Sequence, residues 1–155
     1  MCIRDSNSDD PGDFPAIVEP VLERRAEMAI GSRRLGRSEP GSMTPPQRFG
    51  NVFATWLIAQ LTGDRFTDLG PFRALRWEAL ETLEMEDTNY GWTVEMQVKA
   101  ARRGLGWIEV PVAYRKRVGR SKISGTVSGV AAAGSKILYT VFREVLRPVG
   151  ESEAE

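Results

Sequence analysis

Apolar residues recur at helical spacing in five stretches of this 155-residue chain. Each stretch carries a polar face opposite its apolar face, so each predicts an amphipathic helix. Proline and glycine mark the ends most clearly in the second stretch, which follows Pro45-Pro46 and stops at Gly63. The apolar stripes cover residues 17–22, 47–61, 77–83, 93–103 and 126–147, and the first is preceded by a polar helix entry at residues 8–11.

Two of these helices raise the question of what their apolar faces contact. In the second, the stripe contains Phe49, Phe53 and Trp56, and we expect these rings in the hydrophobic core rather than around a ligand. In the last, basic residues lie opposite the apolar face. That helix either packs on the domain, which we favour, or lies on a membrane surface with its basic residues toward lipid headgroups.

Three shorter segments predict strands at residues 26–31, 72–75 and 107–114. The third alternates cleanly between apolar and other residues, and Pro111 places it at a sheet edge or a bulge. Residues 36–46 are rich in Gly, Ser and Pro and predict a mobile loop. Helices interleaved with short strands indicate an α/β fold with too few strands for a complete sheet.

The domain boundaries follow from length and from the two ends. A chain of 155 residues suffices for one domain. Residues 1–6 are expected to be a non-native, adapter-like segment, so that the native N-terminal part is missing. Residues 7–147 are expected to form the C-terminal part of one domain. Residues 148–155 are predicted to be a disordered acidic tail.

The amino-acid composition excludes several kinds of functional site. The chain has one cysteine and no histidine, which excludes a disulfide framework, a Cys/His zinc site and a Ser-His triad. Lysine plus arginine equal aspartate plus glutamate at 21 each, so no global field attracts nucleic acid. No stretch reaches the roughly 18 uncharged apolar residues of a membrane span. A cytoplasmic location is the expectation, extending to the inner face of the membrane.

The segment around Gly70-Pro71 carries the first candidate chemistry. Asp68 and Arg73 flank a bend that glycine and proline impose. An acid and a guanidinium on either side of a bend suit a pocket for a polar, phosphorylated ligand. The alternative is a surface loop with a solvent-exposed ion pair.

Two further segments offer positive charge. Ser32 and Arg33 follow a predicted strand, at the edge where open α/β sheets bind ligands. The segment 115–122 carries five basic residues and a glycine, and we favour phosphate as its ligand over a solvated loop or a nucleic-acid contact. Near the start, Asp9 and Asp10 could help to hold a divalent cation, but a helix cap is the preferred interpretation.

Taken in order, these motifs resemble the C-terminal part of family 2 glycosyltransferases, close to those that move a sugar from a nucleotide to a polyprenyl phosphate. The resemblance runs from about residue 7 to about residue 147 and rests on several segments in the same order. They are Ser8-Asp9-Asp10-Pro11, Gly31-Ser32-Arg33, Arg48 with Asn51, Thr67-Asp68-Leu69-Gly70-Pro71-Phe72-Arg73, Gly91-Trp92-Thr93-Val94-Glu95-Met96-Gln97, Glu109-Val110-Pro111-Val112-Ala113-Tyr114-Arg115 and Arg117-Val118-Gly119-Arg120-Ser121-Lys122.

The resemblance implies a nucleotide-diphospho-sugar transferase fold (GT-A, Rossmann-like) without its N-terminal nucleotide-binding strands, and inversion at the anomeric carbon. Asp68 would orient the acceptor or act as a base, and orientation is favoured because a phosphate acceptor is already anionic. The implied substrate-binding residues are Ser32, Arg33, Arg48, Arg73, Glu95, Arg115, Arg117 and Lys122.

The resemblance also implies Mg²⁺ or Mn²⁺, held by an Asp-any-Asp motif just ahead of Ser8. That motif is absent, and Ser8 and Asp9 would lie beside it. The chain alone is therefore expected to be inactive. The residues after Asp68 are Leu-Gly-Pro-Phe-Arg where polyprenyl-phosphate mannosyltransferases usually carry Thr-Ser-Gly-Phe-Arg, which leaves the acceptor class open.

Three hypotheses follow for the function of the protein. The first is a glycosyltransferase part, with a nucleotide-sugar donor and a lipid-phosphate acceptor. The second is a non-catalytic remnant that binds phosphate or lipid phosphate. The third, a nucleic-acid module built on the basic segment, is disfavoured by the balanced charge.

Overall fold

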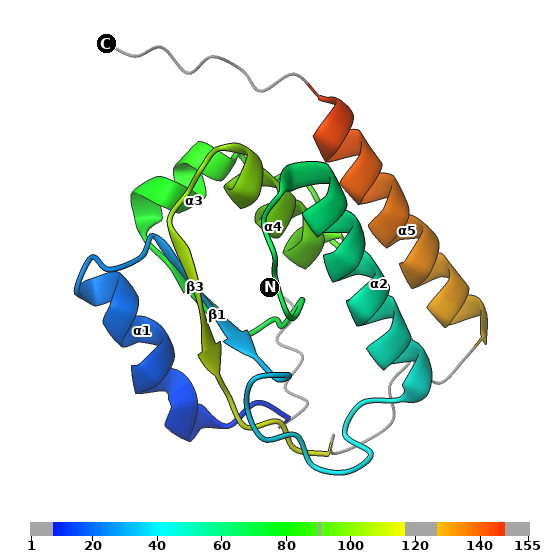
Figure 1. The fold of residues 1–155 in the computed structure, drawn as a ribbon, viewed down its shortest axis with the longest axis horizontal. Coiled ribbons are helices and arrows are strands. Elements are labelled where there is room, and N and C mark those ends of the chain that lie inside the picture. The colour runs from blue at the N-terminus through cyan, green and yellow to red at the C-terminus, as the bar shows by residue number, and fades with distance from the viewer. Residues whose placement is uncertain (1–7, 90, 117–126, 148–155) are drawn as a thin grey trace.

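The computed structural model describes residues 8–89, 91–116 and 127–147, and within the last range it describes side chains from residue 132 onward. These residues form a mixed α/β arrangement (Figure 1), as the sequence predicted. The elements in chain order are the 3₁₀ helix η1 (Pro11–Asp13), α1 (Phe14–Leu22), β1 (Met28–Ser32), α2 (Pro45–Thr62), β2 (Arg73–Leu75), α3 (Trp77–Leu83), α4 (Trp92–Arg102), β3 (Trp107–Pro111) and α5 (Val127–Leu146).

The three strands form one sheet in the order β2-β1-β3. β1 pairs with β2 antiparallel and with β3 parallel, so it is covered on both edges, and all five of its residues are buried. Buried strands with both faces covered are apolar throughout, which explains the run Met-Ala-Ile-Gly. β3 is an edge strand, as Pro111 predicted, and it ends earlier than the alternation suggested.

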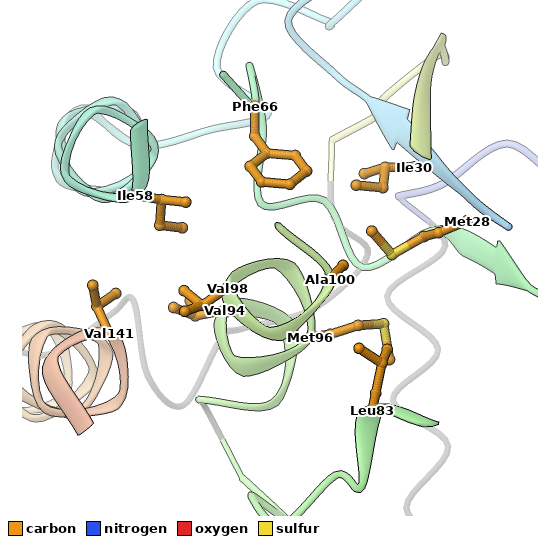
Figure 2. Packing of buried hydrophobic residues seen from close by; sticks show 10 residues of the cluster. All are labelled: Met28, Ile30, Ile58, Phe66, Leu83, Val94, Met96, Val98, Ala100 and Val141. Atoms are coloured by element: carbon orange, nitrogen blue, oxygen red, sulfur yellow. The ribbon is translucent and has the colours of Figure 1, made fainter. Parts of the chain in front are cut away.

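The larger core lies between the sheet and the four helices α2, α3, α4 and α5 (Figure 2). α4 is central to it: Val94 and Val98 face α2 and α5, while Met96 lies beside Leu83 of α3. Phe66 stacks at a tilt on Trp107 with ring centroids 4.2 Å apart. The buried members are Met28, Ile30, Ile58, Phe66, Leu83, Val94, Met96, Val98, Ala100 and Val141.

The opposite face of the sheet is covered by α1 (Figure 1). Ala29 of β1 points to this side, because neighbouring residues of a strand alternate between faces. It packs with Ile17 of α1 and with Val112, which follows β3. Asp10 provides the helix entry ahead of α1 by accepting a hydrogen bond from the Gly12 amide, so Asp10 is the cap that the sequence indicated.

The orientation of α2 differs from the prediction. The aromatic stripe was expected in the core, but Phe49, Phe53 and Trp56 are 73%, 39% and 54% exposed. The buried face carries Asn51, Ala54, Thr55 and Ile58 instead. The prediction was wrong because two polar residues occupy inward positions, so the most apolar stripe of this helix is not its buried one.

α5 packs on the rest of the domain, which was the favoured alternative for this helix. Val141 of α5 lies in the larger core, and the helix contacts α4 and α2. Lys136 of this helix pairs with Asp87 at 2.7 Å, and Arg147, directly after the helix, pairs with Glu86 at 2.6 Å, so both charges are paired within the domain. Among the described helices, none has the length and apolarity needed to cross a membrane.

Gly70 is predicted to be intolerant of a side chain. A Cβ at this position would lie 2.4 Å from the carbonyl oxygen of Gly31, so Gly70→Ala must displace β1 or the bend. We expect it to lower the free energy of unfolding in urea by about 1–3 kcal/mol. The matched control is Gly50→Ala, where a Cβ meets nothing within 4 Å inside α2 and stability should be unchanged or higher. Equal stability of the two variants would contradict the close approach.

Candidate functional site

The centre of the candidate site is a buried ion pair between Asp68 and Arg33. The Arg33 backbone amide and Nε both donate to Asp68 Oδ2, at 2.8 and 2.7 Å, and Arg33 Nη2 donates to Oδ1 at 2.6 Å. The Asp68 side chain is fully buried. The pair is therefore not the exposed surface pair that was one alternative, and the partner of Asp68 is Arg33 rather than Arg73.

Sheet geometry brings these two segments together. β1 ends at Ser32, so Arg33 lies at the C-terminal end of the central strand. The Ser32 and Thr67 hydroxyls share a hydrogen bond of 2.6 Å, which ties the end of β1 to the residue before Asp68. The Arg33 guanidinium also lies over the Tyr114 ring, 5.0 Å from its centroid. The predicted location at a strand end is thus confirmed for Ser32 and Arg33.

Three side chains from three elements hold the backbone on either side of the Asp68 carboxylate. Glu109 of β3 accepts from the Thr67 and Asp68 amides at 2.8 and 3.2 Å. Asn51 of α2 accepts from the Leu69 amide at 2.9 Å and donates to the Thr67 carbonyl at 3.3 Å. Gln97 of α4 donates to the Asp68 carbonyl at 2.8 Å. These contacts fix where the carboxylate points.

Asn51, Gln97 and Glu109 had no individual role in the sequence analysis, although each lies in a quoted motif. The available signal was a polar residue on the inward side of an apolar element: Asn51 and Gln97 are 6% and 0% exposed. Buried polar groups are retained where they are hydrogen-bonded. Here their partners are the backbone groups around Asp68.

Arg73 lies in the same neighbourhood with a different set of partners. Its guanidinium donates to the Thr93 carbonyl at 3.2 Å and to the Gly70 carbonyl at 2.5 Å, and it lies 6.0 Å from the Trp92 ring centroid. Its buried Nε has no hydrogen-bond partner among the described residues. Arg73 is thus held by neutral groups, while the nearby carboxylate is committed to Arg33.

The pKa values of the charged groups at this site reflect their different partners. Burial lowers the pKa of Arg73 to about 10, with Asp68 opposing and Arg33 reinforcing the shift, so Arg73 remains charged at neutral pH. Burial alone would lower the pKa of Arg33, but the hydrogen bond and the charge of Asp68 raise it overall. Burial raises the pKa of Asp9, against the attraction of Arg33. The charge of Arg33 is thus paired with Asp68, whereas Arg73 is charged without a carboxylate hydrogen-bond partner among the described residues, and such a guanidinium can bind an anion.

Glu95 lies apart from this group. It accepts hydrogen bonds from the Glu86 and Asp87 amides at 2.9 and 2.7 Å and pairs with Lys99 at 2.8 Å. Burial would raise its pKa, but these partners lower it overall. The structure thus places Glu95 between α4 and the segment before it, and its arginine neighbour is Arg143 at 3.5 Å rather than Arg33 or Arg73.

The remaining predicted residues are distributed around the centre. Ser8 is buried, and Asp9 forms an isolated bridge with Tyr114. Arg115 forms an exposed ion pair with Asp10, and Arg48 is exposed on α2. Arg117 and Lys122 lie outside the described residues.

The residues that the structure describes do not fit a divalent metal site. Among them, no three acidic, histidine or cysteine side chains converge as ligands. Asp9 has a buried Oδ1 without a hydrogen-bond partner, but one carboxylate oxygen does not make the six-oxygen shell that Mg²⁺ requires. Without further ligands, these residues would hold such an ion only weakly.

Comparison with known proteins identifies several glycosyltransferases as relatives. An uncharacterised glycosyltransferase of Mycobacterium tuberculosis is 34% identical over 122 residues, which are 77% of this chain and 54% of the relative. An undecaprenyl-phosphate mannosyltransferase of Micrococcus luteus is 30% identical over 129 residues, 80% of this chain and 52% of the relative. A dolichyl-phosphate hexose transferase of Haloferax volcanii is 33% identical over 117 residues, which are 72% of this chain and 49% of the relative.

The chain thus spans about half the length of these curated relatives. No protein-family model matches it. No solved structure matches it either.

Proposed function

The chain is a homologue of glycosyltransferases over about three quarters of its length, and from this premise we propose that it is the acceptor-binding part of an inverting, family 2 enzyme with a GT-A fold. Two of the relatives are named for transfer to undecaprenyl phosphate and dolichyl phosphate. The proposed acceptor is accordingly a polyprenyl phosphate, and the proposed donor is a nucleotide-diphospho-sugar.

In the proposed reaction, an acceptor phosphate oxygen attacks the anomeric carbon of the donor sugar. The bond from that carbon to the donor's phosphate oxygen breaks, the nucleoside diphosphate leaves with the electron pair, and the configuration inverts. A phosphate monoester is anionic at neutral pH and needs no base. Asp68 therefore orients the site, because both of its carboxylate oxygens are already hydrogen-bonded to Arg33.

The observation that carries this proposal is the state of Arg73. Its guanidinium is charged and interacts electrostatically with Asp68 and Arg33, lies near the Trp92 ring, and among the described residues hydrogen-bonds to carbonyls alone, with a buried, unpaired Nε. Leaving a buried cation without an anion costs free energy, and that cost is recovered when an anionic ligand binds. A phosphate group supplies that charge and accepts several hydrogen bonds from guanidinium groups.

A second candidate is a protein that binds lipid phosphate without transfer. It is favoured by the lack of convergent acidic ligands among the described residues. Mg²⁺ or Mn²⁺ binding remains a prediction for sequence that precedes Ser8. Under both candidates the protein works at the cytoplasmic face of a membrane, where a polyprenyl phosphate is found.

The test uses farnesyl phosphate as a short, soluble acceptor and farnesol as its control without phosphate. We expect the chain to bind farnesyl phosphate at least ~10-fold more tightly than farnesol, since charge-assisted hydrogen bonds contribute about 1.5–3 kcal/mol each. Equal affinity for the two would refute a phosphate site. Incubation with labelled nucleotide sugars, with the chain extended to the length of its relatives, then separates the candidates: a labelled prenyl-linked sugar supports the transferase, and binding without product supports the remnant.

A further inference from the structure

The Arg33 guanidinium is held along one edge and covered on one side. Asp68 accepts hydrogen bonds from its Nε and Nη2, which lie along the same edge of the planar group. The guanidinium carbon lies over the Tyr114 ring, 5.0 Å from the ring centroid. A guanidinium carries five N–H groups, so the edge between Nη1 and Nη2 stays outside the pair with Asp68. The Arg33 side chain is 13% exposed while that of Asp68 is fully buried, so an anion can reach the pair only from the arginine.

Backbone contacts anchor Tyr114 from two sides. Its amide donates to the Arg37 carbonyl, and its carbonyl accepts from the Glu39 amide, both at 2.9 Å. It also forms an isolated antiparallel bridge with Asp9. Two segments that are distant in sequence therefore hold the backbone of Tyr114, and its ring has a fixed base beside Arg33.

We propose that Tyr114 is a positioning residue of the candidate site, whose ring fixes the plane of the Arg33 guanidinium and so directs the Nη1–Nη2 edge toward an incoming phosphate. The inference rests on the proposed function, because it concerns how the same site holds its acceptor. Tyr114 acts through Arg33 and takes no part in the reaction itself.

The physical reason is the freedom that a bidentate ion pair leaves. Two parallel hydrogen bonds fix the position of one guanidinium edge, but the plane can still tilt about the line that joins Nε and Nη2. An aromatic ring on one side opposes that tilt through the attraction between the cation and the face of the ring. A guanidinium with a fixed plane loses less conformational entropy when it binds a phosphate, which strengthens binding.

The first experiment titrates the chain calorimetrically with farnesyl phosphate. We expect Tyr114→Leu to weaken binding about 3–30-fold, the range of one cation–π contact. Tyr114→Phe keeps the ring and should bind within about twofold of the unaltered chain. The matched control is Tyr139→Leu on α5, because Tyr139 lies beside a cation too, 5.8 Å from Lys136 Nζ, and should leave the affinity unchanged. Urea unfolding of the same samples checks that all variants are folded.

The second experiment follows the Arg33 Nε–Hε signal by NMR, first without ligand. Tyr114→Leu should move this signal, because the ring current is lost, while Tyr114→Phe should leave it almost in place. Farnesyl phosphate should then shift the signal of the unaltered chain less than Tyr114→Leu does, because Asp68 keeps this N–H. A larger shift would show that the phosphate displaces Asp68 from this edge, which contradicts the proposal.

The remaining outcomes separate this inference from the proposed function. Equal binding of farnesyl phosphate and farnesol by the unaltered chain refutes the phosphate site itself. A preference for farnesyl phosphate that survives Tyr114→Leu refutes the role of Tyr114 alone. Burial lowers the pKa of Arg33, while Asp68 and then the Tyr114 hydroxyl raise it, so the hydroxyl is a second route of action. Equal losses in Tyr114→Phe and Tyr114→Leu would assign the effect to that hydroxyl and overturn positioning by the ring.

Discussion

Asp68→Asn is expected to reduce sugar transfer at least ~100-fold in the chain extended to the length of its relatives, on the scale of a lost electrostatic contact at a reacting centre. The substitution keeps the shape of the side chain but removes the charge that holds the Arg33 guanidinium. Initial rates with labelled nucleotide sugar and farnesyl phosphate measure the effect. Transfer at the unaltered rate would show that Asp68 has no part in the reaction.

The same substitution also affects folding, and the two effects must be separated. Breaking a buried pair by removing one partner costs about 3–5 kcal/mol, because it leaves an uncompensated charge, here Arg33. The double variant Asp68→Asn, Arg33→Met removes both charges and should recover much of the stability in urea. We expect it to remain defective in transfer. Recovery of transfer with stability would make Asp68 a structural residue only.

Arg73→Gln is expected to weaken farnesyl phosphate binding about 10–100-fold, the value of one charge-assisted hydrogen bond to a phosphate. Stability should not fall to the same degree, because Arg73 has no carboxylate partner of its own among the described residues and its buried charge costs free energy. Isothermal titration and urea unfolding on the same samples compare the two quantities.

The control for this prediction is Arg76→Gln. Arg76 lies three residues away at the start of α3 and makes one long ion pair, 3.7 Å, with the exposed Glu78. Both its affinity and its stability should match the unaltered chain. A large loss of stability in Arg73→Gln with normal phosphate binding would assign Arg73 to the architecture of the bend instead of the ligand.

The sequence predicted the helices well because proline, glycine and periodicity mark their ends. α2 begins at Pro45 and ends ahead of Gly63, which adopts a left-handed conformation with φ of 85°. It predicted the orientation of α2 poorly, since the inward positions of Asn51 and Thr55 are polar. Polar residues at buried positions are stabilised by hydrogen bonds to other elements, and the spacing of apolar residues along the chain does not reveal those bonds.

At the candidate site, too, the sequence predicted what depends on local signals and missed what depends on long-range contacts. Asp68, Ser32 and Arg33 were identified because a strand end and a Gly-Pro bend are local signals. Their partnership was not identified, because Arg33 and Asp68 are 35 residues apart in sequence and meet only through the sheet. An exposed pair of Asp68 with Arg73 was one alternative from the local pattern, whereas in the fold the partner of Asp68 is Arg33.

One consequence concerns the two faces of α2. Asn51 touches the backbone beside Asp68 on the inner side of α2, while Phe53 and Trp56 stand on its outer side. A helix with its side chains is about 10–12 Å across. The two faces of α2 are thus separated by the thickness of the helix, so a substitution at Phe53 or Trp56 leaves the hydrogen bonds that hold the Asp68 backbone in place.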